Sequence, residues 1–284
     1  MFPPAEEDRS VNFSHHPTAG TPQSRLVRAK DFARRGWKQA VWLAVITGLV
    51  VFLAGRERTC RALPNFAAIK DTDERKAAFI DHLAPMVARA NREVAALRAR
   101  LLAINAAWVS GMPPGPRQRD FVLAAASRYG FGKVTEVDRA LMGRLLDRVD
   151  TLPVSLVVAQ AAIESGWGTS RFAQKGNNLF GMRNYSENGG MVPKERAPEA
   201  SFEVTVFSDA CDAVRAYMLN LNIDSRYQEL RTLRGQLRAK GGVVTGDHLA
   251  DGLRHYSSRG DDYVEDVKGL IASNKLGRLD TDDD

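Results

Sequence analysis

Hydrophobic and polar positions are patterned in several distinct ways along this chain, and the first pattern is an uninterrupted apolar run. Residues 40–55 read AVWLAVITGLVVFLAG and have basic segments on both sides. With aromatic and basic residues at its ends to reach the interfaces, such a run can cross the hydrocarbon core of a bilayer. We therefore predict a transmembrane signal-anchor at 39–56, after a disordered cytoplasmic tail at 1–38. A cleaved signal peptide is the main alternative, although the preceding arm is long for one, and a buried core helix is another.

After the apolar run, hydrophobic residues recur at spacings of three and four, which is the period of an amphipathic helix. They are Phe79, Leu83, Met86, Val87, Val94, Leu97, Leu101 and Ile104. The pattern predicts a helix from Asp73 to about Val109, bent or restarted at Pro85. The proline- and glycine-rich stretch SGMPPGPRQ ends this helix. We expect residues 63–110 to form a helical stalk ahead of a separate domain.

Three shorter helices are predicted beyond this break, in RDFVLAAASRYGF, TEVDRALMGRLLDRV and PVSLVVAQAAIES. The third is apolar on nearly every side, so it should lie at the centre of a domain. Asp150 or Thr151 is expected to cap its N-terminus, with Pro153 in its first turn, where a missing amide hydrogen costs little. Gly166 is expected to end it in the left-handed conformation.

Composition changes this picture in two respects. With 284 residues, the chain is long enough for one domain and an appendage. Its net charge of +6 indicates a basic surface, which suits an anionic partner. Nucleic acid, anionic lipid and an anionic cell-wall polymer all satisfy that description. The two cysteines, Cys60 and Cys211, are too few for a disulfide framework and have no metal-binding spacing. We expect two unrelated thiols.

The most informative single residue is Glu164, in the last turn of the central apolar helix. A helix C-terminus carries partial negative charge, so an ionised carboxylate there is disfavoured by the dipole as well as by burial. Both effects raise the pKa of Glu164, and Trp167 nearby would add a desolvating wall. A carboxyl group that stays protonated near neutral pH is what a general acid requires. The alternative is a partly exposed glutamate that bonds a neighbouring backbone amide.

The loop that follows the helix is unusually rich in small polar and aromatic residues. Residues 168–182 read GTSRFAQKGNNLFGM. Amides bond sugar hydroxyls and aromatic rings stack on pyranose faces, so this composition suits sugar recognition. Phe180 fits that role and the role of a core side chain equally well.

The stretch LVVAQAAIESGWGTSRFAQKGNNLFG, residues 156–181, resembles the glucosaminidase domain of glycoside hydrolase family 73. The flanks resemble bacterial Bax-type proteins, so the likeness spans Leu63 to Leu276. The resemblance implies a mainly α (α+β) fold, lysozyme-like with a small β-lobe, over 117–277. The acidic residues at 278–284 are expected to form a tail. It implies hydrolysis of β-1,4 bonds after N-acetylglucosamine in peptidoglycan, with no metal or organic cofactor.

Carried over residue by residue, the resemblance assigns roles within the expected cleft. Glu164 matches the catalytic acid, and Tyr256 best matches a cleft tyrosine that supports the departing or attacking group, with Tyr263 packed behind it. The alternative is that both tyrosines are core residues of a terminal helix. The expected substrate-binding residues are Trp167, Asn177, Asn178, Phe180 and Gly181, three of which belong to the family's Asn-Leu-Phe-Gly motif.

The second carboxylate is where the sequence departs from the family. Related glucosaminidases often have another glutamate on a β-hairpin, and the corresponding stretch here is condensed. It offers Glu187, Glu195, Glu199 and Glu203. The alternation in SFEVTVF predicts a strand that points Glu203 to the same side as Thr205, whereas Glu195 has the better spacing and is favoured. If neither reaches the cleft, the substrate's own acetamido group is the natural substitute.

Together these patterns favour a membrane-anchored peptidoglycan hydrolase. The expected partners are glycan strands and the inner-membrane bilayer rather than nucleic acid, with the catalytic domain in the periplasm. A lytic transglycosylase and a non-catalytic wall-binding module remain the alternatives, and a scaffold built on the long helix is a third.

Overall fold

The computed structural model describes residues 60, 63–184, 190–193 and 202–281. Every described residue lies in one compact unit, Arg56–Asp284. No helix within the described residues is both long and apolar enough to cross a membrane. The predicted tail at 1–38 and the predicted span at 39–56 lie outside the described residues.

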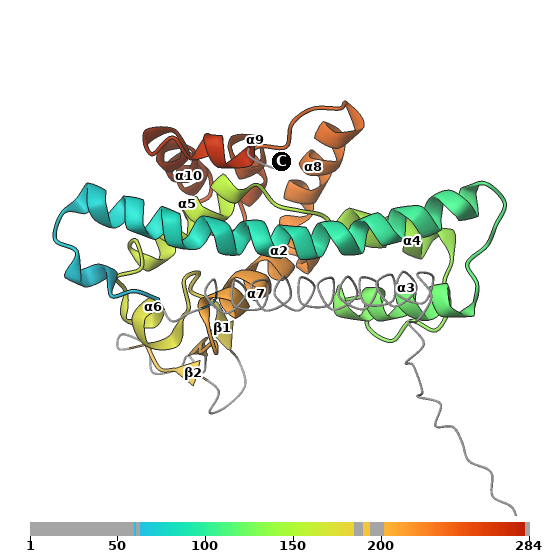
Figure 1. The fold of residues 1–284 in the computed structure, drawn as a ribbon, viewed down its shortest axis with the longest axis horizontal. Coiled ribbons are helices and arrows are strands. Elements are labelled where there is room, and N and C mark those ends of the chain that lie inside the picture. Colours follow the sequence, from blue (N-terminus) through green and yellow to red (C-terminus); the bar gives the residue numbers. More distant parts are fainter. Residues whose placement is uncertain (1–59, 61–62, 185–189, 194–201, 282–284) are drawn as a thin grey trace, which may run out of the picture. The chain divides into compact units, whose positions relative to one another are not determined.

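The described unit is mainly helical with one small sheet (Figure 1). Its α-helices are α2 (Thr72–Val109), α3 (Pro116–Arg128), α4 (Arg139–Arg148), α5 (Val154–Ser165), α6 (Arg171–Gly176), α7 (Ala210–Ile223), α8 (Gln228–Ala239), α9 (Gly246–Ala250) and α10 (Asp261–Ser273). The strands are β1 (Arg183–Asn184), β2 (Gly190–Met191) and β3 (Glu203–Thr205). Short 3₁₀ turns are η1 (Phe66–Ala68), η2 (Ser225–Tyr227), η3 (Asp251–Leu253) and η4 (Leu276–Asp280). The predicted class, mainly α with a small β element, is confirmed.

Helix α2 is one continuous helix of 38 residues that begins at an Asp71 cap, whose side chain accepts a hydrogen bond from Glu74 N at 2.8 Å. It continues through Pro85 without the predicted restart. A proline inside a helix costs about 3 kcal/mol. Leu83 and Met86, on either side of it, are buried in the core. We infer that this packing offsets the missing backbone hydrogen bond.

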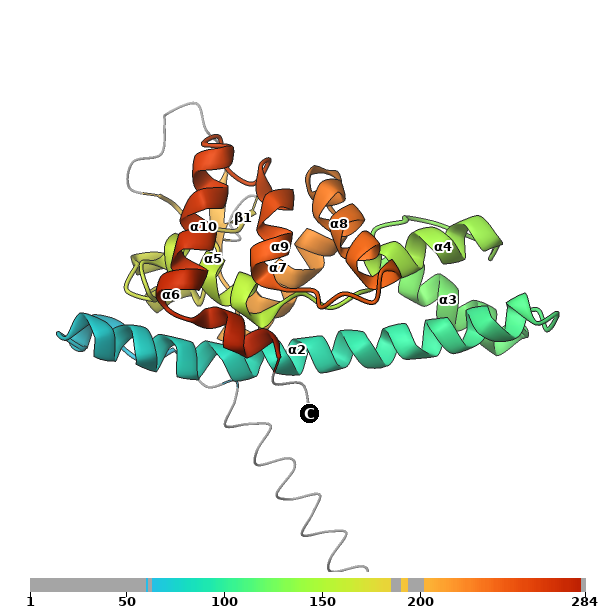
Figure 2. The same cartoon turned by 90° about the horizontal axis from the view of Figure 1, so that it is seen from above.

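Two hydrophobic cores lie along α2, one for each half of the helix. The N-terminal half, including Phe79 and Leu83, packs with α5 and α7 in the main core. The C-terminal half, including Leu101 and Ile104, forms a second core with α3 and α4. Figure 2 shows α2 running past both groups of helices. Residues 63–110 therefore lie in the same compact unit as the helices that follow, whereas a separate stalk was expected, because both halves of α2 contribute buried side chains to a shared core.

Helix α5 is buried on almost every side, as its apolar composition predicts. The predicted cap is wrong, because neither Asp150 nor Thr151 caps this helix. Instead the Asp280 carboxylate, from η4 at the far end of the sequence, accepts hydrogen bonds from Ser155 N at 2.9 Å and Ser155 Oγ at 2.6 Å. The predicted acidic tail at 278–284 therefore contains a structural residue.

Asp150 has a different role, in a buried ionic cluster at the end of α4. Its carboxylate accepts two hydrogen bonds from Arg238, both at 2.8 Å, and lies 3.4 Å from Arg98 Nη2 and 3.6 Å from Arg234 Nε. Arg234 also donates to the carbonyl of Asp147 at 2.9 Å, so the cluster satisfies carbonyl groups at the C-terminus of the helix.

The sheet has the order β1-β3-β2 with both pairs antiparallel. Val204 at its centre pairs with Arg183 on one side and Met191 on the other. The strand predicted in SFEVTVF is confirmed by β3, although it has only three residues.

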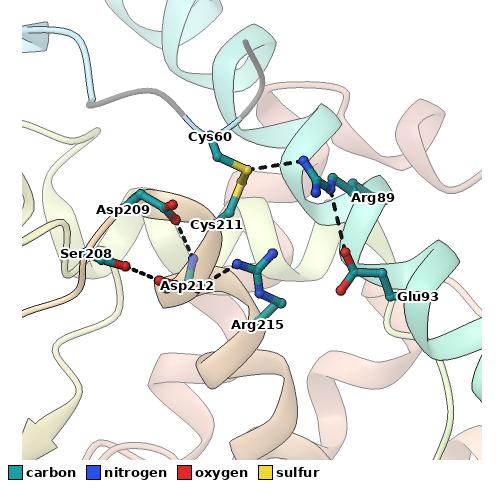
Figure 3. The surroundings of a disulfide bond; sticks show 8 residues. All are labelled: Cys60, Arg89, Glu93, Ser208, Asp209, Cys211, Asp212 and Arg215. Atoms are coloured by element: carbon teal, nitrogen blue, oxygen red, sulfur yellow. Dashed lines mark hydrogen bonds and ion pairs between the residues drawn. A yellow bond between two sulfur atoms is a disulfide. The ribbon is translucent and has the colours of Figure 1, made fainter. Parts of the chain in front are cut away.

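Cys60 and Cys211 form a disulfide, so the prediction of two unrelated thiols is wrong (Figure 3). The bond joins residue 60 to the start of α7 across a sequence separation of 151 residues. Arg89 of α2 donates to Cys60 Sγ at 3.3 Å, so three distant segments meet here. Cysteine spacing alone cannot reveal such a pairing, because tertiary contacts bring the two residues together.

Candidate active site

The position of Glu164 is set by the way α5 ends. Gly166 takes the left-handed conformation (φ 57°, ψ 51°), as predicted. The buried Ser165 hydroxyl donates to Ala161 O at 2.6 Å and accepts from Gly168 N at 2.8 Å, which ties the following turn to the helix. Glu164 is thus held in the last turn, at the surface of an otherwise buried helix.

A chain of hydrogen bonds orients the Glu164 carboxyl group. Tyr263 Oη of α10 donates to Glu164 Oε1 at 3.1 Å, and Gln160 Nε2, one turn back on α5, donates to Tyr263 Oη at 3.2 Å. Gln160 is fully buried, which fixes the far end of the chain. The tyrosine expected only to pack behind Tyr256 is therefore the one that contacts the candidate acid.

The surroundings of Glu164 favour its protonated form. The residue as a whole is exposed, although the surrounding protein partly desolvates its carboxyl group. This partial burial raises the pKa of Glu164, and the Tyr263 hydrogen bond opposes the rise by stabilising the ionised form. Burial and the nearby Glu164 carboxylate also raise the pKa of Tyr263, so that tyrosine acts as a hydrogen-bond donor and not as a base.

The second carboxyl oxygen of Glu164 faces the turn formed by the Asn-Leu-Phe-Gly motif. A Cβ atom added to Gly181 would lie 3.7 Å from Glu164 Oε2, and Gly181 has a positive φ of 63°. Asn178 holds this turn, because its Nδ2 donates to Met182 O and its Oδ1 accepts from Met182 N, at 2.9 and 3.0 Å. Only 1% of Asn178 is exposed. Its side chain therefore positions the backbone beside Glu164.

A cluster of aromatic rings supports the site from behind. Phe180 stacks on Tyr217 with ring centres 3.9 Å apart, and Tyr256 stacks on Tyr263 at 4.9 Å. Tyr256 Oη donates to Phe180 O at 3.3 Å, which links the turn to the loop between η3 and α10. Phe180 is 3% exposed, so the structure gives it a core position. Tyr256 contacts Tyr263, which in turn bonds Glu164, so Tyr256 supports Glu164 only indirectly.

The other two residues expected to bind substrate lie on the same loop, with their described contacts inside the protein. Trp167 has a positive φ of 58° and packs edge-on against Phe79 of α2, with ring centres 5.7 Å apart. Asn177 ends α6 in the left-handed region and donates from Nδ2 to Phe207 O at 3.0 Å. Their roles toward substrate stay predictions.

Of the four candidates for the second carboxylate, Glu203 lies among the described residues. Glu195, the favoured candidate, lies outside them, as do Glu187 and Glu199. Glu203 is described, and its Oε2 accepts a hydrogen bond from Gly190 N at 2.7 Å across the sheet. Its carboxylate is thus engaged within the β element.

Sequence reasoning missed Gln160 and Tyr217 as parts of the site. Gln160 is a fully buried polar residue within an apolar helix, one turn before Glu164. A lone polar residue in such a helix indicates a side chain that needs a buried hydrogen-bond partner, so Gln160 could have been found from the sequence. Tyr217 has no such signal, because its contact with Phe180 joins α7 to the loop only in the folded chain.

A carboxyl group with a raised pKa at a helix end, oriented by a tyrosine, is suited to donate a proton to a leaving oxygen, which is the role of a glycosidase acid. The comparisons agree with this class. The glucosaminidase family model, described as mannosyl-glycoprotein endo-beta-N-acetylglucosaminidase, matches residues 141–276.

The chain is also 32% identical over 219 residues to Protein bax of Escherichia coli strain K12, covering 75% of each chain. It therefore belongs to the Bax-type family of proteins with a glucosaminidase domain. Among solved structures, the catalytic domain of the autolysin Auto from Listeria monocytogenes matches with 18% identity and a TM-score of 0.39, covering 75% of this chain and 92% of that one.

Proposed function

We propose that the chain is a membrane-anchored peptidoglycan hydrolase that cleaves β-1,4 bonds after N-acetylglucosamine. The observation that carries the proposal is the Glu164 carboxyl group, with its raised pKa, its Tyr263 hydrogen bond and its position against Gly181. Membership of a family with a glucosaminidase domain supports the reaction class. The net charge of +6 favours an anionic wall polymer as substrate.

In the proposed reaction Glu164 protonates the leaving glycosidic oxygen as positive charge develops on the sugar ring. Tyr263 keeps the carboxyl group oriented, and Tyr256 supports this arrangement through its stack on Tyr263 and its bond to Phe180 O. Attack on the sugar comes from water activated by Glu195 or, without a second carboxylate, from the substrate's acetamido group. No step calls for a metal or an organic cofactor.

The proposal places the catalytic domain outside the cytoplasm, held by a span at 39–56. Disulfides persist in oxidising compartments such as the periplasm, and the Cys60–Cys211 bond supports that location. The test is to isolate the chain from cells in the presence of a thiol-blocking reagent. Neither cysteine should be modified, whereas modification of both thiols would contradict this location.

The reaction is tested by incubating the purified full-length chain, and separately its Glu164→Gln variant, with peptidoglycan. Mass spectrometry of the released fragments identifies their sugar ends. Reducing N-acetylglucosamine ends that are lost in Glu164→Gln are the expected result, because glutamine preserves the shape and cannot donate the proton. Anhydro-muramyl ends would instead indicate a lytic transglycosylase. Wall binding without any fragments would indicate a non-catalytic module.

A further inference from the structure

A hollow of about 600 Å³ lies beside the candidate active site, and Glu164 is not among its lining residues. It is open to solvent and is formed mainly by the loop between η3 and α10. Its lining residues are Arg226, Arg254, His255, Tyr256, Ser257, Ser258, Gly260 and Asp261.

The hollow and the catalytic acid share one wall. Tyr256 lines the hollow and stacks on Tyr263, with ring centres 4.9 Å apart, and Tyr263 bonds Glu164. A ligand in the hollow would therefore be separated from the acid by two aromatic side chains. At this distance from Glu164 the hollow can hold a group that branches from a bound glycan strand. It cannot hold the glycosidic bond that Glu164 would protonate.

The donors around the hollow are suited to a carboxylate. Arg254 is 53% exposed and forms an ion pair with Asp261, with its Nε 2.7 Å from Asp261 Oδ1. Within the described part of the chain its two terminal nitrogens have no partner, so one edge of the guanidinium group can bond a ligand. Arg226 is held by Asp224, with Nη2 2.7 Å from Oδ2, and adds a second guanidinium group. The Arg254–Asp261 pair is exposed on both sides and therefore weak, so an incoming carboxylate can compete for Arg254.

Neutral sugars do not require paired guanidinium groups, because hydroxyls are bound well by amides and carboxylates. In peptidoglycan the carboxylates belong to the stem peptides, which branch from every second sugar of the strand. We propose that this hollow binds a stem-peptide carboxylate of the strand held at Glu164, with Arg254 as the main contact. This inference rests on the proposed function and deepens it, since it assigns the enzyme to peptide-bearing strands.

The chain offers a closely matched control. Arg259, in the same loop, is also 53% exposed and bonds Asp266 at 2.7 Å, seven residues further on, but it does not line the hollow. The experiment uses the full-length chain with Arg254→Gln or Arg259→Gln. The KM of each is measured on glycan strands with intact stem peptides and on strands from which an amidase has removed the peptides. The lactyl carboxylates that the amidase frees are first converted to neutral amides, so that the second substrate carries no branching carboxylate.

The expected result is that Arg254→Gln raises the KM on peptide-bearing strands about three- to fivefold, as for the loss of one solvent-exposed ion pair. The KM on stripped strands should not change, and Arg259→Gln should affect neither substrate. An equal KM increase on both substrates, or no increase on either, would overturn the proposal.

A binding measurement separates this proposal from the catalytic one. The soluble tetrapeptide L-alanyl-γ-D-glutamyl-diaminopimelyl-D-alanine is titrated into the unmodified chain and both variants and followed by calorimetry. Weaker binding in Arg254→Gln alone supports the hollow as the peptide site even if the chain cleaves no glycan. Equal binding by all three chains, or no binding by the unmodified chain, refutes it whether or not glycan is cleaved.

Discussion

Replacing Asp280 with alanine tests how the last residues of the fold hold the helix that carries Glu164. The Asp280 carboxylate accepts three hydrogen bonds, from Ser155 N at 2.9 Å, Ser155 Oγ at 2.6 Å and Gly246 N at 2.9 Å. Ser155 is fully buried, so its amide and hydroxyl cannot turn to bulk solvent when the carboxylate is lost. The negative charge also lies at the N-terminus of α5, where the helix dipole favours it.

Loss of a helix cap costs roughly 0.5–2 kcal/mol, and unpaired buried polar groups add to that cost. Because Asp280 is itself half-buried, we expect a total loss of about 2–3 kcal/mol rather than the full sum. In a domain of this size 1 kcal/mol corresponds to roughly 2–4 °C in Tm, so Tm should fall by about 4–12 °C.

The measurement is calorimetric unfolding of the full-length chain and of Asp280→Ala, with Glu265→Ala as the control. Glu265 is exposed on α10, so its loss should change the free energy of unfolding by no more than about 0.5 kcal/mol. Asp280→Asn keeps one acceptor oxygen and should fall between the two. If Asp280→Ala unfolds within about 1 °C of the unmodified chain, the reasoning that η4 caps α5 is refuted.

Two further predictions concern the acid and the disulfide. Tyr263→Phe removes the hydroxyl that stabilises the ionised form of Glu164, so the pKa of Glu164 should rise further. The alkaline limb of the pH–kcat profile should then move to higher pH. Because the carboxyl group also loses its orienting bond, kcat should fall about tenfold or more. An alkaline limb that stays in place or moves to lower pH would show that this bond does not tune the acid. Replacing Cys60 and Cys211 together by serine should lower stability by about 2–4 kcal/mol, because the bond closes a long loop in the unfolded chain; calorimetry that shows no change would contradict a formed disulfide.

Much of the helical architecture can be predicted from local pattern. The spacing of apolar residues predicted both ends of α2 to within about one residue. The composition of α5 predicted its burial, and Gly166 predicted where it ends, because both properties depend on residues that are neighbours in the sequence. Glu164 could be singled out for the same reason, since its place in the last turn is a local property.

Only the tertiary structure decided which residues that are distant in the sequence contact one another. The cap of α5 comes from Asp280, 125 residues further along the chain, and the partner of Glu164 is Tyr263, 99 residues away. The Cys60–Cys211 bond likewise spans 151 residues. Sequence periodicity carries no information on such pairings, because they depend on which faces of the helices meet when the cores form. The amino-acid sequence thus determined the helices and the candidate acid, and the packing of those helices decided which residues cap, orient and surround it.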